Sequence, residues 1–266
     1  MDSRSGNEFA LLDDRFLEAP SLAVEHCKQV INKMADISRE SLFISMSLIG
    51  GYDEEQALRV GELETRADKY EDALGTYIMK ISTKNLKKED SEMLNVMLHC
   101  IGDFERISDY ACNICDSARE LQQKNMQFSP KAETELDILS SAVREAVDIS
   151  FDAFKSNNKN EADKVEPLEE LIDTLAVELK ARHIRRLREG KCTIELGFAH
   201  SDILNNLERV ADHCSNIAVD VIQSDQSEFD AHEYLDRIKN KDNQQFAKDY
   251  KAYKDKYRLP ETRSFQ

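Results

Sequence analysis

The segment GDFERISDYACNI at residues 102–114 returns in altered form as NNLERVADHCSNI at residues 205–217. The second copy begins 103 positions after the first, and both keep a glutamate and an aspartate four residues apart in an otherwise apolar frame. A repeat of this length at a fixed separation indicates an internal duplication. It also raises a question, because a helix that is to be buried does not ordinarily carry a pair of carboxylates.

Apolar residues recur every three to four positions through both copies, which is the period of an amphipathic helix. The same period predicts six long helices and a weaker seventh, over residues 21–49, 53–81, 89–124, 131–156, 160–187, 195–223 and 231–254. Only 8 glycines and 4 prolines in 266 residues agree with a mainly helical chain. No stretch of the sequence shows the alternation that is typical of a strand.

The breaks between the predicted helices repeat as well. The break at 50–53 corresponds to the one at 156–160, and the break at 82–90 corresponds to 188–194. Because short connections make consecutive helices antiparallel, we predict an all-α fold of two tandem three-helix bundles with an additional C-terminal helix. The predicted parts are an N-terminal lead (1–19), a first repeat (20–125), a second repeat (126–224) and a tail with a short helix (225–266).

The chain is acidic, with 52 Asp and Glu against 36 Lys and Arg and a formal net charge of −16. This charge excludes nucleic acid as a general partner and suits a protein that collects cations, although solvation of long helices explains it more simply. The longest uncharged apolar run, residues 41–52, is too short to span a bilayer. The first twenty residues lack the pattern of a secretory signal, so we expect a cytoplasmic protein.

Four Glu-xxx-Asp pairs lie at the edges of the apolar arcs, two in each half of the chain. The eight carboxylates are Glu64, Asp68, Glu105, Asp109, Glu169, Asp173, Glu208 and Asp212. Residues four apart point the same way on a helix, so two pairs on adjacent helices bring four carboxylates together. These acids repel one another unless a cation joins them. The pattern therefore predicts a site for hard metal ions such as iron, manganese, magnesium, calcium or zinc.

Two other functions compete with a metal-binding surface. If each acid pairs with a neighbouring arginine (Arg66, Arg106 or Arg209), the chain is a metal-free structural helical adaptor. The other candidate is a carboxylate-bridged dimetal enzyme, whose ferritin-like form needs Glu-x-x-His on two helices. None of the six histidines has a glutamate three residues before it, and no phosphate loop or nucleophile–base motif is present in the sequence. We therefore predict that the chain is not an enzyme.

The remaining chemistry-bearing residues have simpler roles as their first explanation. CNIC at 112–115 falls within a predicted helix, where reduced core cysteines are more frequent than a redox or metal centre. His183 and His200 fall on apolar arcs, where a core histidine is more frequent than a metal ligand. His213 falls on the far side of its helix and is expected to face solvent.

Two segments near the C-terminus have distinctive patterns. KARHIRRLREGK at 180–191 is a dense basic cluster that complements the macrodipole at a helix C-terminus, and contact with phosphate, a membrane or a transporter loop is its second possible role. The aromatic residues at 246, 250, 253 and 257 are spaced along one helix face. We expect this face to dock back on the bundle, with a partner protein as the alternative.

The repeated segments DFERISDYA and NLERVADHC resemble the two signature segments of PhoU-type proteins, and the two helices with the other Glu-xxx-Asp pairs match their companions. The lead-in at 11–42 resembles the start of the PhoU-like cytoplasmic region of bacterial Na⁺/phosphate cotransporters of the NptA type. The tail at 232–260 is similar to the end of the same proteins. The resemblance covers residues 10–260.

This resemblance implies two three-helix bundles and a role in controlling phosphate uptake. It also implies, as in some members, multinuclear metal clusters (iron, or manganese, magnesium or zinc) on the eight carboxylates. The implied partner is a membrane phosphate transporter, in cis or in trans at the inner face of the plasma membrane, and shared ions would also allow a homodimer. Since no membrane segment precedes the resembling region, we expect either the cytoplasmic part of a transporter or a stand-alone relative.

Overall fold

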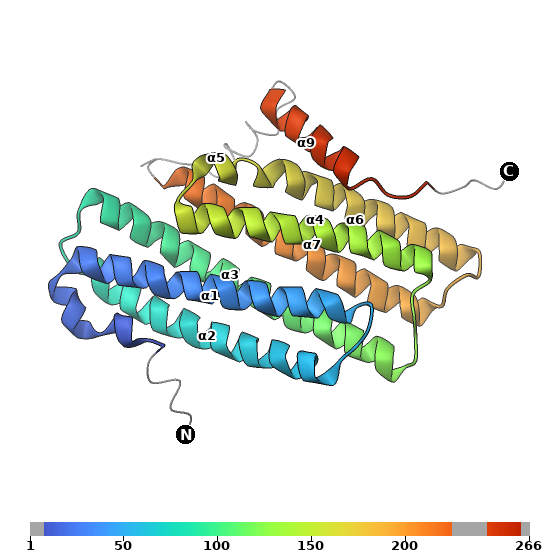
Figure 1. The fold of residues 1–266 in the computed structure, drawn as a ribbon, viewed down its shortest axis with the longest axis horizontal. Helices are drawn as coiled ribbons and strands as arrows, with labels where there is room; N and C mark the ends of the chain where they lie inside the picture. The colour runs from blue at the N-terminus through green and yellow to red at the C-terminus, as the bar shows by residue number, and fades with distance from the viewer. Residues whose placement is uncertain (1–7, 225–243, 262–266) are drawn as a thin grey trace.

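The computed structural model describes residues 8–224 and 244–261, and within these residues it contains helices and no strand (Figure 1). The long helices are α1 (Pro20–Leu48), α2 (Glu54–Ser82), α3 (Lys88–Gln123), α4 (Pro130–Ser156), α6 (Val165–Arg188) and α7 (Ile194–Gln223). Shorter ones are η2 (Ala10–Leu12), η3 (Asp14–Glu18), α5 (Lys159–Ala162) and α9 (Gln244–Lys256). The prediction of an all-α fold is confirmed.

Side-chain caps at the helix starts determine where the chain turns back. Asp53 accepts a hydrogen bond from the backbone of α2, and Thr193 does the same for α7. Ser129 caps α4, with Pro130 at the first helical position. At the other end of α4, Asn157 adopts the left-handed conformation (φ 50°), which ends the helix. The resulting short turns make consecutive helices antiparallel.

The helix that was predicted over 160–187 is divided in the structure. The short α5 ends at Ala162, and α6 starts at Val165. Pro167 explains the division, because proline has no N–H and is tolerated in the first turn of a helix but not in its interior. Residues 231–243 of the predicted tail helix lie outside the described residues, and the described part of this helix is α9.

Helices α1, α2 and α3 form one bundle, and α4, α6 and α7 form the other (Figure 1). The third helices of the two bundles, α3 and α7, pack against each other along their length and join the halves. At the centre of this region the fully buried Phe104 of α3 makes edge contacts with Phe151 and Phe154 of α4, with ring centroids 4.8 and 5.2 Å apart. Two tandem bundles are thus confirmed, whereas the four-part division of the chain stays a prediction.

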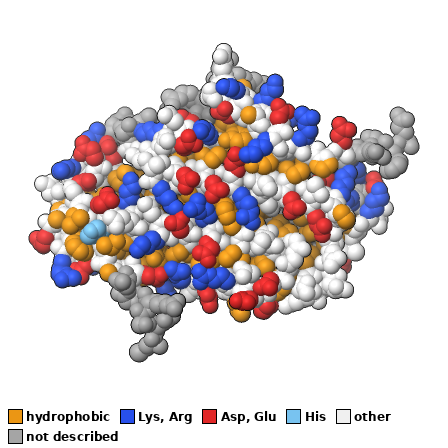
Figure 2. Space-filling model, viewed as in Figure 1, with side chains coloured by type: hydrophobic (Ala, Val, Ile, Leu, Met, Phe, Trp, Pro, Cys, Tyr) orange, Lys and Arg blue, Asp and Glu red, His pale blue; other side chains and the backbone are white. Residues whose placement is uncertain are grey.

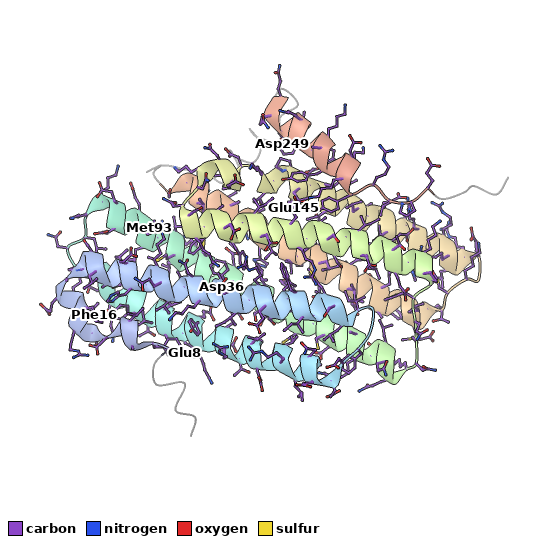
Figure 3. All side chains as sticks on the ribbon, viewed as in Figure 1. Glu8, Phe16, Asp36, Met93, Glu145 and Asp249 are labelled. Atoms are coloured by element: carbon purple, nitrogen blue, oxygen red, sulfur yellow. The ribbon has the colours of Figure 1, made fainter. Side chains whose placement is uncertain are left out.

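Polar pairs accompany this apolar contact. His213 of α7 forms a 2.7 Å hydrogen bond with Asp103 of α3, and its side chain is only 18% exposed. The prediction that His213 faces solvent is therefore wrong, because the side of α7 that turns away from its own bundle packs on α3. A second seam joins α1 to α4, where Asp36 of α1 (labelled in Figure 3) pairs with Lys155 of α4, and Arg39 of α1 lies 3.3 Å from Asp148 of α4.

The C-terminal segment docks on the second bundle, as its aromatic pattern predicted. The hydroxyl of Tyr257 donates a hydrogen bond to the backbone oxygen of Ser141, and Lys256 pairs with Glu145 at 2.7 Å. Arg182 donates to the backbone oxygen of Pro260 at 2.8 Å. The segment thus lies against both α4 and α6.

The basic cluster at 180–191 contributes to this packing. Glu135 of α4 is fully buried and pairs with Arg182 at 2.9 Å and with Arg186 at 2.6 Å. A buried carboxylate requires such partners.

On the face shown in Figure 2, acidic and basic side chains are interspersed. None of the helices in the described ranges has a stretch that is long and apolar enough to cross a membrane.

Replacement of Phe104 by alanine removes the ring that joins α3 to α4. We expect the free energy of unfolding to fall by about 3–5 kcal/mol, because Phe104 is fully buried and the alanine would leave a cavity in its place. Leu58→Ala is the control, since Leu58 is 61% exposed on α2 and its loss should cost less than about 0.5 kcal/mol. Denaturant unfolding of both variants measures the difference, and equal effects would contradict the central role of Phe104.

Candidate metal centre

Three carboxylates of the first bundle meet between α2 and α3. Glu64 and Asp68 lie one turn apart on α2, and Asp109 faces them from the antiparallel α3. One oxygen from each lies within 4.8 Å of the others. We name these three residues cluster 1. They hold only oxygen donors, which are the ligands of hard cations.

The folded chain holds these acids together against their charge. Although the Asp68 side chain is exposed, partial desolvation raises the pKa of its carboxyl, and the charge of Asp109 adds to the shift. Burial also raises the pKa of Glu64, with a further contribution from Asp68. The pKa of the neighbouring Glu105 is raised to about 7 by burial and by the charge of Asp109. A bound cation would relieve this repulsion.

One arginine accompanies cluster 1 without enclosing it. Arg106 lies 3.1 Å from Asp109 and 3.6 Å from Glu105, but its side chain is 59% exposed. An ion pair this exposed is weak. Arg66, the other candidate partner, pairs with Glu8 instead (Figure 3 labels Glu8 beside α2). The arginine pairing that would make these acids ordinary surface residues therefore applies only in part.

The second bundle repeats this arrangement. Glu169 and Asp173 of α6 meet Asp212 of α7, again with one oxygen from each within 4.8 Å of the others. We name these three residues cluster 2. Arg209 pairs with Asp212 at 2.9 Å, as Arg106 does with Asp109.

Cluster 2 is the less exposed of the two, since Glu169 is buried and Asp173 and Asp212 are half-buried, whereas Asp68 of cluster 1 is exposed.

The structure thus brings together six of the eight predicted carboxylates and leaves two aside. Glu105 lies beside cluster 1 but outside its group of close oxygens. Glu208 pairs instead with Lys180 at 2.8 Å. Lys180 corresponds to Gly75 in the first repeat, by the same shift of 105 that relates Glu64 to Glu169. Gly75 has no side chain that could pair with Glu105. The two clusters therefore differ by one lysine, a difference that the spacing of the acids did not reveal.

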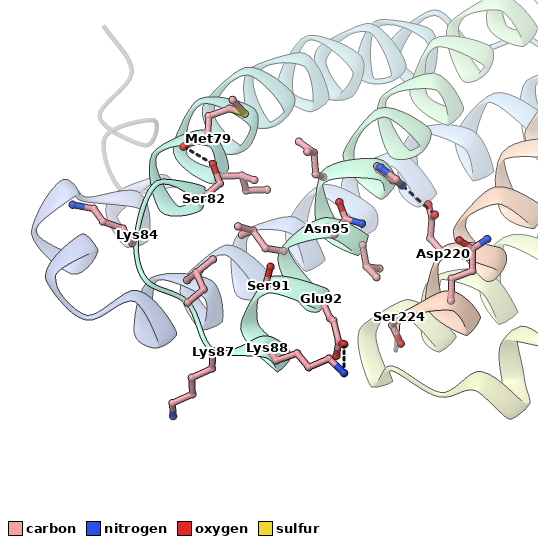
Figure 4. A pocket seen from close by; sticks show the side chains of 17 residues that line it. Met79, Ser82, Lys84, Lys87, Lys88, Ser91, Glu92, Asn95, Asp220 and Ser224 are labelled. Atoms are coloured by element: carbon pink, nitrogen blue, oxygen red, sulfur yellow. Dashed lines mark hydrogen bonds and ion pairs between the residues drawn. The ribbon is translucent and has the colours of Figure 1, made fainter. Parts of the chain in front are cut away.

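A cavity of about 850 Å³ lies at the far end of the α2–α3 hairpin, beside the end of α7 (Figure 4). Three lysines line it, but Lys84 and Lys87 point away from it and Lys88 pairs with a glutamate of its own helix. His99 and Asp220 face each other across one side at 3.3 Å. Because its positive charges do not converge, this cavity is a weaker candidate for a binding site than the clusters.

A family model described as the PhoU domain matches residues 31–118 and, a second time, residues 136–221. The chain belongs to the PhoU domain family. The first matched stretch contains cluster 1 and the second contains cluster 2. Each PhoU repeat therefore supplies one group of three carboxylates.

Phosphate-transport accessory proteins are similar to this chain in sequence. The chain is 26% identical over 196 residues to the phosphate-specific transport system accessory protein PhoU homolog 1 of Thermotoga maritima, covering 73% of this chain and 84% of that protein. A PhoU homolog of the same description from Synechocystis is 22% identical over 198 residues, covering 74% and 86%.

Two solved structures share the fold. PhoU from Pseudomonas aeruginosa superimposes with a TM-score of 0.71 at 21% identity, covering 78% of this chain and 97% of that one. The phosphate transport system regulatory protein PhoU from Streptococcus pneumoniae superimposes with a TM-score of 0.70 at 16% identity, covering 79% of this chain and 98% of that one.

Asp220, beside the cavity, makes the stability of this PhoU fold depend on pH. Burial raises its pKa from 3.8 to about 6, against the opposing effect of His99. The folded chain therefore keeps a proton that the unfolded chain releases, so the free energy of unfolding falls as the pH rises from about 4 to about 6. Across this interval we expect the free energy of unfolding of the wild type to fall by on the order of 2 kcal/mol more than that of Asp220→Asn, whose side chain cannot ionise. Urea unfolding at several pH values provides the measurement, and parallel curves for the two proteins would contradict it.

Proposed function

We propose that this chain is a non-enzymatic regulator of phosphate transport that binds metal ions at clusters 1 and 2. The observation that carries the proposal is the recurrence of three close carboxylates in each PhoU repeat. The relatives are named as accessory or regulatory proteins of phosphate transport, which supports the regulatory role.

The carboxylates fit a multinuclear site for iron, manganese, magnesium or zinc. Glu64, Asp68 and Asp109 would hold one group of ions and the corresponding residues of cluster 2 the other, with carboxylates bridging neighbouring ions. A bound cation supplies positive charge at a surface that is otherwise acidic. Because each cluster takes its carboxylates from two helices, a bound ion would tie α2 to α3 and α6 to α7 and stiffen both bundles. The metal-free adaptor is the competing proposal.

The partner in this proposal is a membrane phosphate transporter of the Na⁺/phosphate cotransporter type, at the inner face of the plasma membrane. The resemblance of the lead-in and the tail to such proteins supports this partner. A metal-dependent contact along the two clusters would then transmit phosphate status to the transporter. The donor set argues against a dimetal oxidase, because both clusters consist of carboxylates without a histidine.

Removal of the carboxylates tests the metal sites directly. Glu64→Ala, Asp68→Ala and Asp109→Ala together should lower the bound metal by about half, and the same changes in cluster 2 should remove the rest, because the clusters are separate. Elemental analysis of protein that was purified without chelator gives the stoichiometry. The control is Glu133→Ala with Asp137→Ala, an exposed pair on α4 with the same spacing.

Unchanged stoichiometry in the six-fold variant would rule out the clusters as the ligands. The regulatory role is measured separately, by phosphate uptake in cells that carry the wild-type or the variant chain. We expect the variant to lose the restriction of uptake in phosphate-rich medium. Normal restriction by a metal-free variant would separate regulation from metal binding.

Lys180 should weaken metal binding at cluster 2, because its ammonium group holds Glu208 and places a positive charge beside the site. Lys180→Ala is therefore expected to tighten metal binding at cluster 2 by about tenfold, equivalent to about 1.4 kcal/mol, which is typical of one close charge. Titration calorimetry on a chain that lacks the carboxylates of cluster 1 isolates this effect. Lys124→Ala, which breaks an exposed pair with Glu120 at the C-terminal end of α3, is the control. Weaker binding in Lys180→Ala would show that the lysine supports the site.

A further inference from the structure

The turn between α6 and α7 exposes large apolar side chains at the end of the second bundle. Ile184 of α6 is 50% exposed, and Ile194 and Phe198 of α7 are 61% and 68% exposed. We name these three residues the tip patch. They belong to neither carboxylate cluster, and the regulatory function proposed above gives them no role. Large apolar side chains that gather on a surface mark a contact with another molecule or with a membrane.

The members of the tip patch share one side of the α6–α7 hairpin. His183 of α6 lies against Gly197 of α7, where a Cβ atom would be 2.9 Å from Nε2 of His183. Ile184 and Phe198 each directly follow one of these two facing residues. Because α6 and α7 are antiparallel right-handed helices, the residues that follow a facing pair lie on the same side of the hairpin. Ile194 joins them, since it precedes Phe198 by one turn of α7.

Positive charges accompany the tip patch. The segment at 180–191 contains six lysines and arginines and one acid, Glu189, in a chain whose net charge is −16. Arg185 and Arg188 are exposed, and neither forms an ion pair with another described residue. Lys191 is 63% exposed and pairs with Glu189 at 2.7 Å. Figure 2 shows Lys and Arg side chains gathered at this end of the molecule.

The state of Glu189 reflects these surroundings. Its pKa is lowered by a hydrogen bond from Lys191 and by the charge of that lysine, and Arg185 and Lys131 of α4 contribute as well. Glu195, in the first turn of α7, offsets one of the positive charges. The macrodipole of α6 favours cations at this end of the helix. It does not explain why large apolar side chains are exposed among them.

This combination of side chains fits the surface of an anionic lipid bilayer. Phenylalanine and isoleucine enter the boundary between headgroups and acyl chains, while arginine and lysine reach the lipid phosphates. The α6–α7 turn lies at the right-hand end of the molecule in Figure 1, beyond the ends of α1, α2 and α3. A flat surface can therefore reach the turn without meeting the first bundle.

The acidity of the remaining chain favours contact through this end alone. Asp212 of cluster 2 lies fourteen residues further along α7 than Phe198, which is about 21 Å at the helical rise of 1.5 Å per residue. The screening length at physiological ionic strength is about 8 Å. The acids of cluster 2 therefore repel an anionic surface weakly when the turn touches it, and strongly when the hairpin lies flat on it.

We propose that the tip patch and the cations beside it form a binding surface for anionic lipid bilayers. Ile184, Ile194 and Phe198 enter the bilayer boundary, and Arg185 and Arg188 pair with lipid phosphates. The contact adds lipid itself to the transporter partner proposed above, and it needs neither a transporter nor a metal ion.

Sedimentation of the full chain with lipid vesicles tests this surface. Vesicles of phosphatidylglycerol and phosphatidylcholine in equal parts should bind the protein, whereas vesicles of phosphatidylcholine alone should not. An increase of the salt concentration from about 0.05 M to about 0.5 M should weaken binding at least about tenfold, because salt screens the attraction. EDTA in the buffer prevents ions from bridging the carboxylate clusters to the lipid.

Apolar variants at the two ends of the molecule locate the contact. Ile184→Gln together with Phe198→Gln should weaken vesicle binding at least about tenfold. Met79→Gln is the matched control, because Met79 is 60% exposed and corresponds to Ile184 by the shift of 105, at the far end of the other hairpin. Since all three positions are exposed, the thermal melts should stay close to that of the wild type.

Charge variants follow the same design. Arg185→Gln together with Arg188→Gln should weaken binding at least about tenfold. Lys84→Gln together with Lys87→Gln removes the same charge at the end of the α2–α3 hairpin and should have little effect.

A tryptophan reporter measures insertion directly, since the chain contains no tryptophan of its own. Phe198→Trp should shift its emission to shorter wavelength when anionic vesicles are added, because the indole enters the bilayer boundary. Met79→Trp should keep its emission unchanged.

Two results would overturn the proposal. The first is a wild-type chain that does not sediment with the anionic vesicles at low salt, which would leave the tip patch to a protein partner. The second is an equal loss of binding in the variants of both hairpins, which would show that the contact is not at this turn. Neither result affects the function proposed for the carboxylate clusters, because the assay contains no transporter and no free metal ion.

Discussion

The antiparallel packing of α3 on α7 is the constraint on which the rest of the structure depends. These two helices are buried on two sides, one toward their own bundle and one toward the other. Polar pairs between them fix the register. His99 of α3 faces Asp220 of α7. Four residues further along α3 and four residues back along α7, Asp103 faces Asn216. With both helices held in this way, their remaining sides carry Asp109 and Asp212 to the two carboxylate clusters.

The two clusters have the same origin in sequence but different surroundings. Cluster 1 is the more exposed and has Glu105 beside it. Cluster 2 is more buried, and its neighbour Glu208 forms an ion pair with Lys180. Duplication supplies the same carboxylates twice, and single substitutions around them then change charge and access independently. If the clusters bind ions as proposed, two unequal sites would respond over a wider range of ion concentrations than two equal sites.

Most of the fold follows from apolar periodicity, because long helices with one buried side give a clear signal. The same signal misplaced His213, since a helix that is buried on two sides has no far side facing solvent. Six of the eight carboxylates could be grouped from spacing alone. The position of Glu208 depends on Lys180, which reaches it from another helix. The approach of Cys192 to His183 depends on the conformation of a turn. Neither contact produces a periodic pattern in the sequence.

The contact between α3 and α7 also bears on how such a chain arose. Two corresponding helices that pack antiparallel are what a symmetric dimer of a single repeat would show at its two-fold axis. A one-repeat ancestor would assemble in this way only above a certain protein concentration. Fusion of the two copies makes the same contact intramolecular, so that assembly no longer depends on concentration and each half becomes free to diverge.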